Sequence, residues 1–136
     1  MSCKSAIHTV NTNADVAANG QIPFGSIVRR FGQDVDLQGS DIVCCGRGYY
    51  DCDCSVTLAP VAAGDVGIQL YADGNPIPGA FAQGTGTAGD PLNLCVTALV
   101  RQRCCGATSV SLRLVTPTGI TTGATVANAS MVIEKL

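Results

Sequence analysis

Hydrophobic and polar residues alternate along much of this chain, as they do in strands that bury one face. Residues 49–58 show the alternation most strictly, and a strict period of two over ten residues predicts a half-buried strand. The inward positions are Tyr50, Cys52, Cys54, Val56 and Leu58, and the outward positions are Tyr49, Asp51, Asp53, Ser55 and Thr57.

Similar patterns predict strands over residues 66–72, 92–100 and 110–114, and the β-prone run 124–135 closes the chain. The sequence Asp73-Gly-Asn-Pro76 predicts a turn after the first of these, because Gly adopts positive φ without strain. No segment keeps a helical period of 3.6 residues over three turns. About ten short antiparallel strands, separated by Gly, Pro, Asn and Asp, predict an all-β fold, a single sandwich or jelly roll.

The apolar positions of these strands, which alternate with polar ones, predict the core. A register error of one residue would move every inward side chain to the solvent face, so burial of the core tests the strand assignments. The side chains that we expect to be buried are Tyr50, Val56, Ile68, Leu70, Leu94, Val96, Leu112 and Leu114.

Residues 1–20 follow a different pattern. They are rich in Ser, Thr, Asn and Ala with little alternation, which predicts an N-terminal arm or tether. We expect one domain over residues 21–136, because the chain has no internal repeat. Gly84–Gly89 and Thr116–Gly123 are rich in Gly and Thr and are predicted to be loops.

The composition favours a structural role. Only 13% of the residues are charged, 46% are hydrophobic, and the net charge is −2. Basic residues cluster only at Arg29-Arg30 and Arg101-Gln-Arg103, and there is no Trp, so the sequence does not predict nucleic-acid binding. No run approaches the ~18 apolar residues of a membrane helix. Such a charge-poor surface suggests packing against copies of the same chain.

Eight cysteines in 136 residues are a density typical of secreted disulfide scaffolds. The N-terminus nevertheless shows neither the apolar segment nor the cleavage site of a signal peptide. We therefore expect synthesis in the cytoplasm. The thiols would either stay reduced there or meet oxidant only when the cell lyses, as in a spore coat or a virus particle.

Two pairs of adjacent cysteines, Cys44-Cys45 and Cys104-Cys105, are the candidates for intrachain disulfides, and Cys3 is the candidate for an interchain cross-link. A bridge between the pairs would close a loop of ~60 residues and contribute about 4 kcal/mol to the free energy of unfolding. Adjacent cysteines in a strand point to opposite faces, so each pair offers one inward thiol and one outward thiol. The sequence leaves the connectivity and the redox state open.

No residue is predicted to be catalytic, and no cofactor is expected. His8 lies in the predicted arm, away from the position that the base of a hydrolase triad needs. Asp51 and Asp53 share a strand face about 7 Å apart, and simple solvation is favoured there over a catalytic pair. Cys52 and Cys54 lack the Cys-x-x-Cys spacing of zinc sites, so buried thiols without a metal are predicted.

Several segments occur in an informative order: Ile22-Pro-Phe-Gly-Ser-Ile-Val28, Gly48-Tyr-Tyr50, Ile68-Gln-Leu-Tyr-Ala-Asp-Gly-Asn-Pro-Ile-Pro-Gly79 and Ala129-Ser-Met-Val-Ile-Glu-Lys135. Their order and spacing resemble the C-terminal domain of the BclA-type exosporium glycoproteins, over about residues 21–136. The chain departs from that family in lacking a collagen-like Gly-X-Y stalk. It therefore also resembles the short, stalkless decoration or fibre modules that phages of Gram-positive hosts encode.

The resemblance implies a jelly roll of the tumour-necrosis-factor (TNF) and complement type that assembles as a tight homotrimer. It places the strands of residues 48–58 and 91–100 at the three-fold axis, with Tyr49, Tyr50 and Leu99 as candidates for the trimer interface. Apart from copies of itself, the expected partner is a capsid, tail or spore-coat protein, bound through the N-terminal arm.

The sequence thus predicts a non-enzymatic structural protein, displayed as a trimer on the surface of a phage particle or a spore. The alternative is a module that binds a carbohydrate or a host surface through its loops. Binding to a glycan array would distinguish the two.

Overall fold

The computed structural model of the chain describes residues 4–102, 107–115 and 123–136. Every regular element in these ranges is a strand. The strands are β1 (Ala6–Asn11), β2 (Ala14–Val16), β3 (Gln21–Ile22), β4 (Ser26–Phe31), β5 (Val35–Gln38), β6 (Asp41–Cys44), β7 (Gly48–Pro60), β8 (Gly64–Ala72), β9 (Asn75–Gly86), β10 (Leu92–Gln102), β11 (Thr108–Val115) and β12 (Ala124–Lys135). None of the described residues lies in a helix that could cross a membrane.

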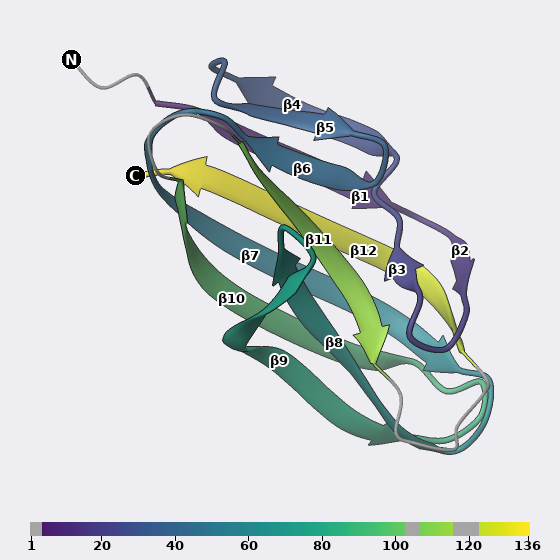
Figure 1. The fold of residues 1–136 in the computed structure, drawn as a ribbon. Helices are drawn as coiled ribbons and strands as arrows, with labels where there is room; N and C mark the ends of the chain where they lie inside the picture. The colour runs from purple at the N-terminus through teal and green to yellow at the C-terminus, as the bar shows by residue number, and fades with distance from the viewer. Residues whose placement is uncertain (1–3, 103–106, 116–122) are drawn as a thin grey trace.

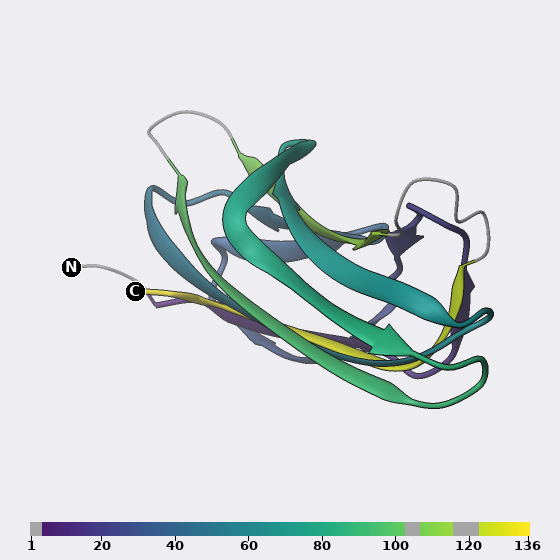
Figure 2. The same ribbon diagram turned by 90° about the horizontal axis from the view of Figure 1, so that it is seen from below.

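The strands form two antiparallel sheets that pack face to face, with β11, β8 and β9 in front of β12, β7 and β10 (Figure 1). Sheet A has the order β10-β7-β12-β1-β4, with β2 paired to β12, and sheet B has the order β5-β6-β11-β8-β9, with β3 paired to β11. Figure 2 shows the two layers from below. The predicted all-β jelly-roll sandwich is confirmed, with twelve strands in the described residues rather than about ten.

The alternating segments lie where the sequence predicts them, in β7, β8, β10 and β11, and the β-prone run 124–135 forms β12. The predicted turn joins β8 to β9, and both of its central residues have positive φ, 52° at Asp73 and 80° at Gly74. Positive φ at both positions is the signature of a type I′ turn, whose twist matches that of the two strands.

One predicted loop is partly wrong. β9 extends to Gly86, so Gly84–Gly86 belong to a strand that pairs with β8. The glycines serve close packing there, because a Cβ at Gly84 would meet the Leu92 side chain at 3.0 Å and one at Gly86 would meet Pro60 at 3.0 Å. Residues 116–122 of the other predicted loop lie outside the described residues.

The core fills the space between the sheets. All eight side chains predicted to be buried are at most 6% exposed, so the predicted phase of every one of these strands is confirmed. They are joined by Ile7 and Ile133 from sheet A, by Ile22 and Ile42 from sheet B, and by Phe24 from the connection between β3 and β4, all at most 1% exposed.

The N-terminal segment corrects the sequence prediction. Residues 6–11 are not an arm: they form β1, which lies between β12 and β4 inside sheet A. The inward positions are Ser5, Ile7 and Thr9, all at most 1% exposed. Two of the three are polar, and this hides the alternation in the sequence. Their hydroxyl groups are satisfied, since Thr9 Oγ1 donates to the carbonyl of Met131 and Ser5 Oγ accepts from the amide of Asp34.

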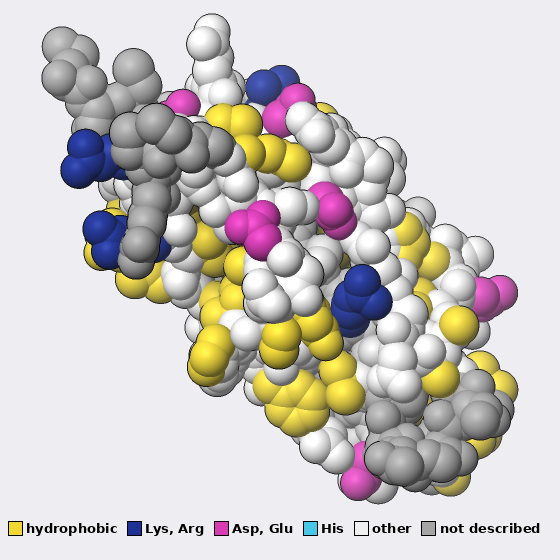
Figure 3. Space-filling view, viewed as in Figure 1, with side chains coloured by type: hydrophobic (Ala, Val, Ile, Leu, Met, Phe, Trp, Pro, Cys, Tyr) yellow, Lys and Arg dark blue, Asp and Glu magenta, His cyan; other side chains and the backbone are white. Residues whose placement is uncertain are grey.

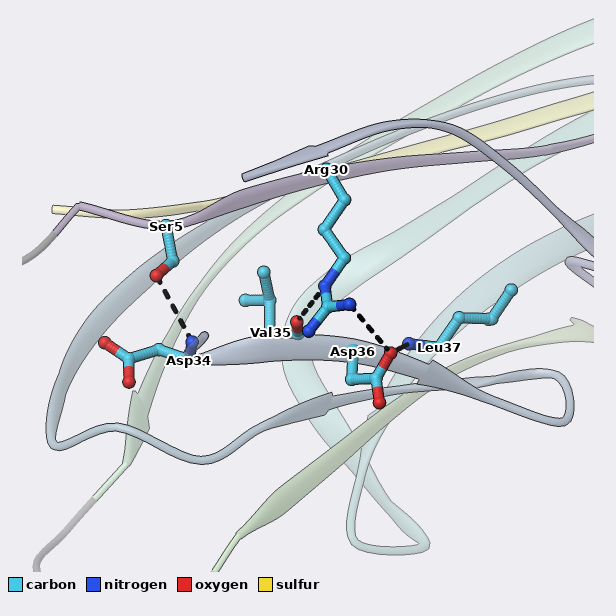
Figure 4. Close-up of polar contacts among 6 residues, drawn as sticks. All are labelled: Ser5, Arg30, Asp34, Val35, Asp36 and Leu37. Atoms are coloured by element: carbon cyan, nitrogen blue, oxygen red, sulfur yellow. Dashed lines mark hydrogen bonds and ion pairs between the residues drawn. The ribbon is translucent and has the colours of Figure 1, made fainter. Parts of the chain in front are cut away.

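Polar contacts join the two sheets at the β4–β5 edge (Figure 4). Arg30 reaches from β4 to β5, where its Nε donates to the carbonyl of Val35 at 2.8 Å and its Nη1 lies 3.7 Å from Asp36 Oδ1. Lys135 Nζ, on β12, lies 2.7 Å from Asp34 Oδ2. These contacts fix how sheet B sits over the edge of sheet A that carries β1 and β4.

Candidate self-association surface

The outer face of sheet A carries one row of side chains that crosses all five of its main strands. The pairings place Leu99 opposite Asp51, Asp51 opposite Glu134, Glu134 opposite Ala6, and Ala6 opposite Phe31. Opposed residues in an antiparallel pair point to the same face, so these five side chains share it. Four strand spacings of about 4.8 Å separate Leu99 from Phe31 by about 19 Å.

One end of this row is an exposed apolar cluster, which we call the Leu99 patch: Tyr49, Leu99 and Arg101. Tyr49 is 47% and Leu99 58% exposed. The Arg101 guanidinium carbon lies 5.7 Å from the centroid of the Tyr49 ring, a cation–π distance. The amide of Leu136 donates to the carbonyl of Tyr49 at 2.9 Å and ties the C-terminus to the same corner.

The opposite end of the row is a depression of about 250 Å³, which we call the Phe31 hollow. Its lining comes from β1, β4 and β12. Phe31 is 56% exposed and Val28 53% exposed, and β4 exposes all six of its residues. The lining residues are Ala6, Ile7, His8, Val28, Arg29, Phe31 and Val132. The sequence does not predict this hollow, because the pattern of residues 1–20 indicates an arm and not the strand β1.

Of the three predicted interface residues, the structure exposes two and buries one. Tyr49 and Leu99 are exposed and adjacent, whereas Tyr50 is fully buried. The Tyr50 hydroxyl donates to the carbonyl of Gly46 at 2.5 Å, and burial, with a smaller contribution from Cys44, raises its pKa to about 12. The prediction of Tyr50 as a core residue is therefore confirmed, and its prediction as an interface residue is wrong, because neighbouring strand residues point to opposite faces.

Carboxylates lie between the two apolar ends of the face. Asp51 and Glu134 are directly opposed across β7 and β12, and Asp53 follows two residues along β7. Desolvation raises the pKa of the Asp53 carboxyl, and the charges of Asp51 and Glu134 raise it further. Like charges at this spacing destabilise a strand pair.

The described cysteines divide into buried and exposed thiols. Cys44, Cys52 and Cys54 are at most 3% exposed, which confirms the predicted burial of Cys52 and Cys54. Burial raises the pKa of the Cys44 thiol to about 12 and those of Cys52 and Cys54 well above the usual value. Cys45 and Cys95 are exposed, and all five are free cysteines.

The proposed disulfides to Cys104 and Cys105, and the cross-link through Cys3, stay predictions, because these three residues lie outside the described ranges. Cys44 and Cys45, the described half of the proposed bridge, both have free thiols in the structure.

His8 lies on β1 rather than in an arm, and its Nε2 is 2.8 Å from Ser130 Oγ. No carboxylate among the described residues is hydrogen-bonded to His8, so the third member of a catalytic triad is not placed there. Within the described ranges, no group of three or more His, Cys, Asp and Glu side chains is arranged to hold a metal ion.

No protein-family model matches the chain, and no curated protein matches it by sequence. Its fold is similar to that of solved structures of the TNF and complement type. The crystal structure of murine APRIL at pH 5.0 matches with a TM-score of 0.76 and 11% identity, over 98% of this chain and 100% of that chain. The globular domain of zebrafish complement 1qA protein matches with a TM-score of 0.69 and 12% identity, over 94% of each chain. Eiger TNF from S. frugiperda matches with a TM-score of 0.61 and 8% identity, over 98% of this chain and 91% of that chain. At these identities the likeness is one of fold.

Proposed function

We propose that the protein is a non-enzymatic structural module that assembles as a homotrimer and is displayed on the surface of a phage particle or a spore. The TNF- and complement-like fold supports the assembly. The resemblance of residues 21–136 to the BclA-type domains supports the location. Attachment to the particle would not use a free arm over residues 1–20, since β1 and β2 belong to sheet A.

The observation that carries this proposal is the pair of unlike apolar sites at opposite edges of one sheet face. A ring of identical subunits needs two different, complementary surfaces on each subunit, whereas a two-fold dimer needs one self-complementary surface. The Leu99 patch is an exposed apolar cluster and the Phe31 hollow is an apolar-lined depression, so the patch of one copy would pack into the hollow of the next. The likeness in fold supports three copies.

The charges beside the two sites are also complementary. Asp51 lies beside Leu99, and Arg29 lines the Phe31 hollow. Arg101 belongs to the Leu99 patch, and Glu134 lies beside Ala6 at the hollow. Seating the patch of one copy on the hollow of the next brings each carboxylate toward an arginine, which favours the heterologous contact over a contact between like sites.

Light scattering tests the assembly. The unaltered chain should show three times the 13.8 kDa mass of one chain. Leu99→Asp at the patch and Phe31→Asp at the hollow should each reduce the mass to that of a single folded chain, because either substitution removes one half of every contact. Val61→Asp, at a side chain 57% exposed after β7, is the matched control and should remain a trimer. A single-chain mass for the unaltered protein at micromolar concentration would rule the proposal out.

The second candidate function is binding of a carbohydrate or a host surface. A depression on the outer face of sheet B, which the proposed trimer contact leaves free, favours it.

A further inference from the structure

The outer face of sheet B has a depression of about 430 Å³, which we call the Arg113 hollow. It lies over β8 and β11 and is bordered by the two turns that precede β3 and β9. Its volume is in the range of small-molecule sites. In Figure 3, which shows this side of the molecule, one isolated group of Lys or Arg atoms lies beside a gathering of hydrophobic side chains. The lining residues are Asn19, Tyr71, Gly74, Arg113, Leu114 and Val115.

Arg113 is held in place by an aromatic ring. Its guanidinium carbon lies 5.3 Å from the centroid of the Tyr71 ring, and the two side chains occupy diagonal positions on neighbouring strands. Both are half-buried. A cation–π contact of this kind fixes the plane of the guanidinium and leaves its edge N–H groups available to an acceptor.

No carboxylate of the described residues neutralises Arg113. The ion pairs within the described ranges are Arg30–Asp36 and Lys135–Asp34. The strand neighbours of Arg113 are two neutral amides, Gln21 on β3 and Gln69 on β8.

The polar groups around Arg113 are engaged elsewhere. Gln21 Nε2 donates to Asp41 Oδ1 at 2.5 Å, and the other carboxylate oxygen of Asp41 accepts from Ser109 Oγ at 3.0 Å. Asp73 Oδ1 accepts from the amide of Ser109 at 3.0 Å. Gln69 Nε2 donates to the carbonyl of Ile77 at 2.8 Å. Asp41 and Asp73 are therefore hydrogen-bonded to other groups, and neither forms an ion pair with Arg113, which lines the hollow.

We propose that the Arg113 hollow binds a sugar that carries a carboxylate, such as a uronic acid or a sialic acid. The planar fork of a guanidinium matches a carboxylate with two parallel N–H···O bonds, and such charge-assisted bonds are stronger than neutral ones. The Tyr71 ring and Val115 supply an apolar wall for the C–H face of a sugar ring. The site lies on sheet B, away from the Leu99 patch and the Phe31 hollow, so it does not depend on the proposed trimer.

Titration of the full chain with glucuronic acid, followed by NMR, tests the site. Chemical shifts of residues that line the Arg113 hollow should move on addition of glucuronate and not on addition of glucose or of the methyl ester of glucuronic acid. Arg113→Gln should weaken binding by about tenfold or more, as expected for the loss of hydrogen bonds to a charged group. Tyr71→Phe should keep the affinity within about twofold, because the ring that orients the guanidinium remains.

Arg47→Gln is the matched control, since it removes the same charge from an exposed position between β6 and β7, and it should leave the affinity unchanged. Inorganic phosphate is the competing probe. Phosphate that displaces glucuronate at equal concentration would overturn the sugar assignment, and so would equal binding of glucose. An Arg113→Gln protein that folds normally and binds glucuronate as the unaltered chain does would overturn the site itself.

Discussion

At the scale of single residues, the chain uses cysteine as a core residue. Cys44 comes from sheet B, while Cys52 and Cys54 come from the inward face of β7, and all three are at most 3% exposed. A buried thiol behaves as a small apolar side chain, and desolvation of its thiolate makes it unreactive. Cys45 and Cys95 have the opposite character, because each points outward next to an inward neighbour.

This division predicts the thiol chemistry of the native protein. Under reducing pretreatment, a thiol reagent such as DTNB should label Cys45 and Cys95 rapidly and should label Cys44, Cys52 and Cys54 only after unfolding. Cys52→Val should change the free energy of unfolding by less than about 1.5 kcal/mol, as near-isosteric core substitutions do. Mass spectrometry of labelled peptides identifies the sites. Rapid labelling of Cys52 or Cys54 in the folded protein would show that β7 does not bury this face.

At the scale of strands, the inward faces of β7 and β12 stabilise the fold, whereas the carboxylates on their outward faces destabilise it. Their inward side chains form the centre of the core, whereas their outward face sets Asp51 opposite Glu134 with Asp53 nearby. The pKa of Asp53 is raised in the folded state, chiefly by desolvation and then by the two neighbouring carboxylates. A carboxyl with a raised pKa stabilises the fold fully only below its unfolded pKa, and that stabilisation is lost as the pH rises through the folded value.

Replacement of Asp53 should therefore stabilise the protein near neutral pH. Asp53→Asn should raise the free energy of unfolding at about pH 7, and the difference from the unaltered chain should shrink as the pH is lowered toward about pH 4. Urea unfolding at a series of pH values measures both effects. Asp65→Asn on β8 is the control with the same change of charge, outside the carboxylate cluster. A stabilisation by Asp53→Asn that stays constant down to pH 4 would contradict the electrostatic explanation.

At the scale of the whole molecule, β1 connects the N-terminal residues to the C-terminal strand. It pairs with β12 along its whole length, from Ala6 opposite Glu134 to Asn11 opposite Ala129. On its other side β1 pairs with β4, and Arg30 of β4 bonds to the carbonyl of Val35 in sheet B. Residues 6–11 thereby support the edge of the sandwich and one side of the Phe31 hollow.

A substitution in β1 tests directly whether residues 6–11 form a strand of the sandwich or an arm. Ile7→Ala should lower the free energy of unfolding by about 2–5 kcal/mol, as Leu112→Ala should, since both side chains are at most 1% exposed. Thr12→Ala, at an exposed position just after β1, should have almost no effect. Calorimetry or urea unfolding provides the measurement. A negligible effect of Ile7→Ala would restore the interpretation of residues 1–20 as an arm.

The sequence by itself determined the alternating strands β7, β8, β10 and β11, the β-prone run that forms β12, and the burial of Tyr50, Leu94 and Leu112 on inward faces. It also predicted the turn at Asp73–Pro76, which the structure shows to be of type I′. These features follow from neighbouring residues, because the pleat alternates side chains locally and positive φ is a property of single positions. The sequence did not determine β1, since polar Ser5 and Thr9 take inward positions there.

Only the tertiary structure decided which exposed residues lie together. Leu99 and Phe31 share one row because three strands from distant parts of the chain lie between them, and Arg113 meets Tyr71 because β11 pairs with β8. The same is true of the carboxylates on β7 and β12, whose register sets Asp51 opposite Glu134. Such contacts depend on strand order and register, which are set by the burial of the whole core rather than by any local pattern.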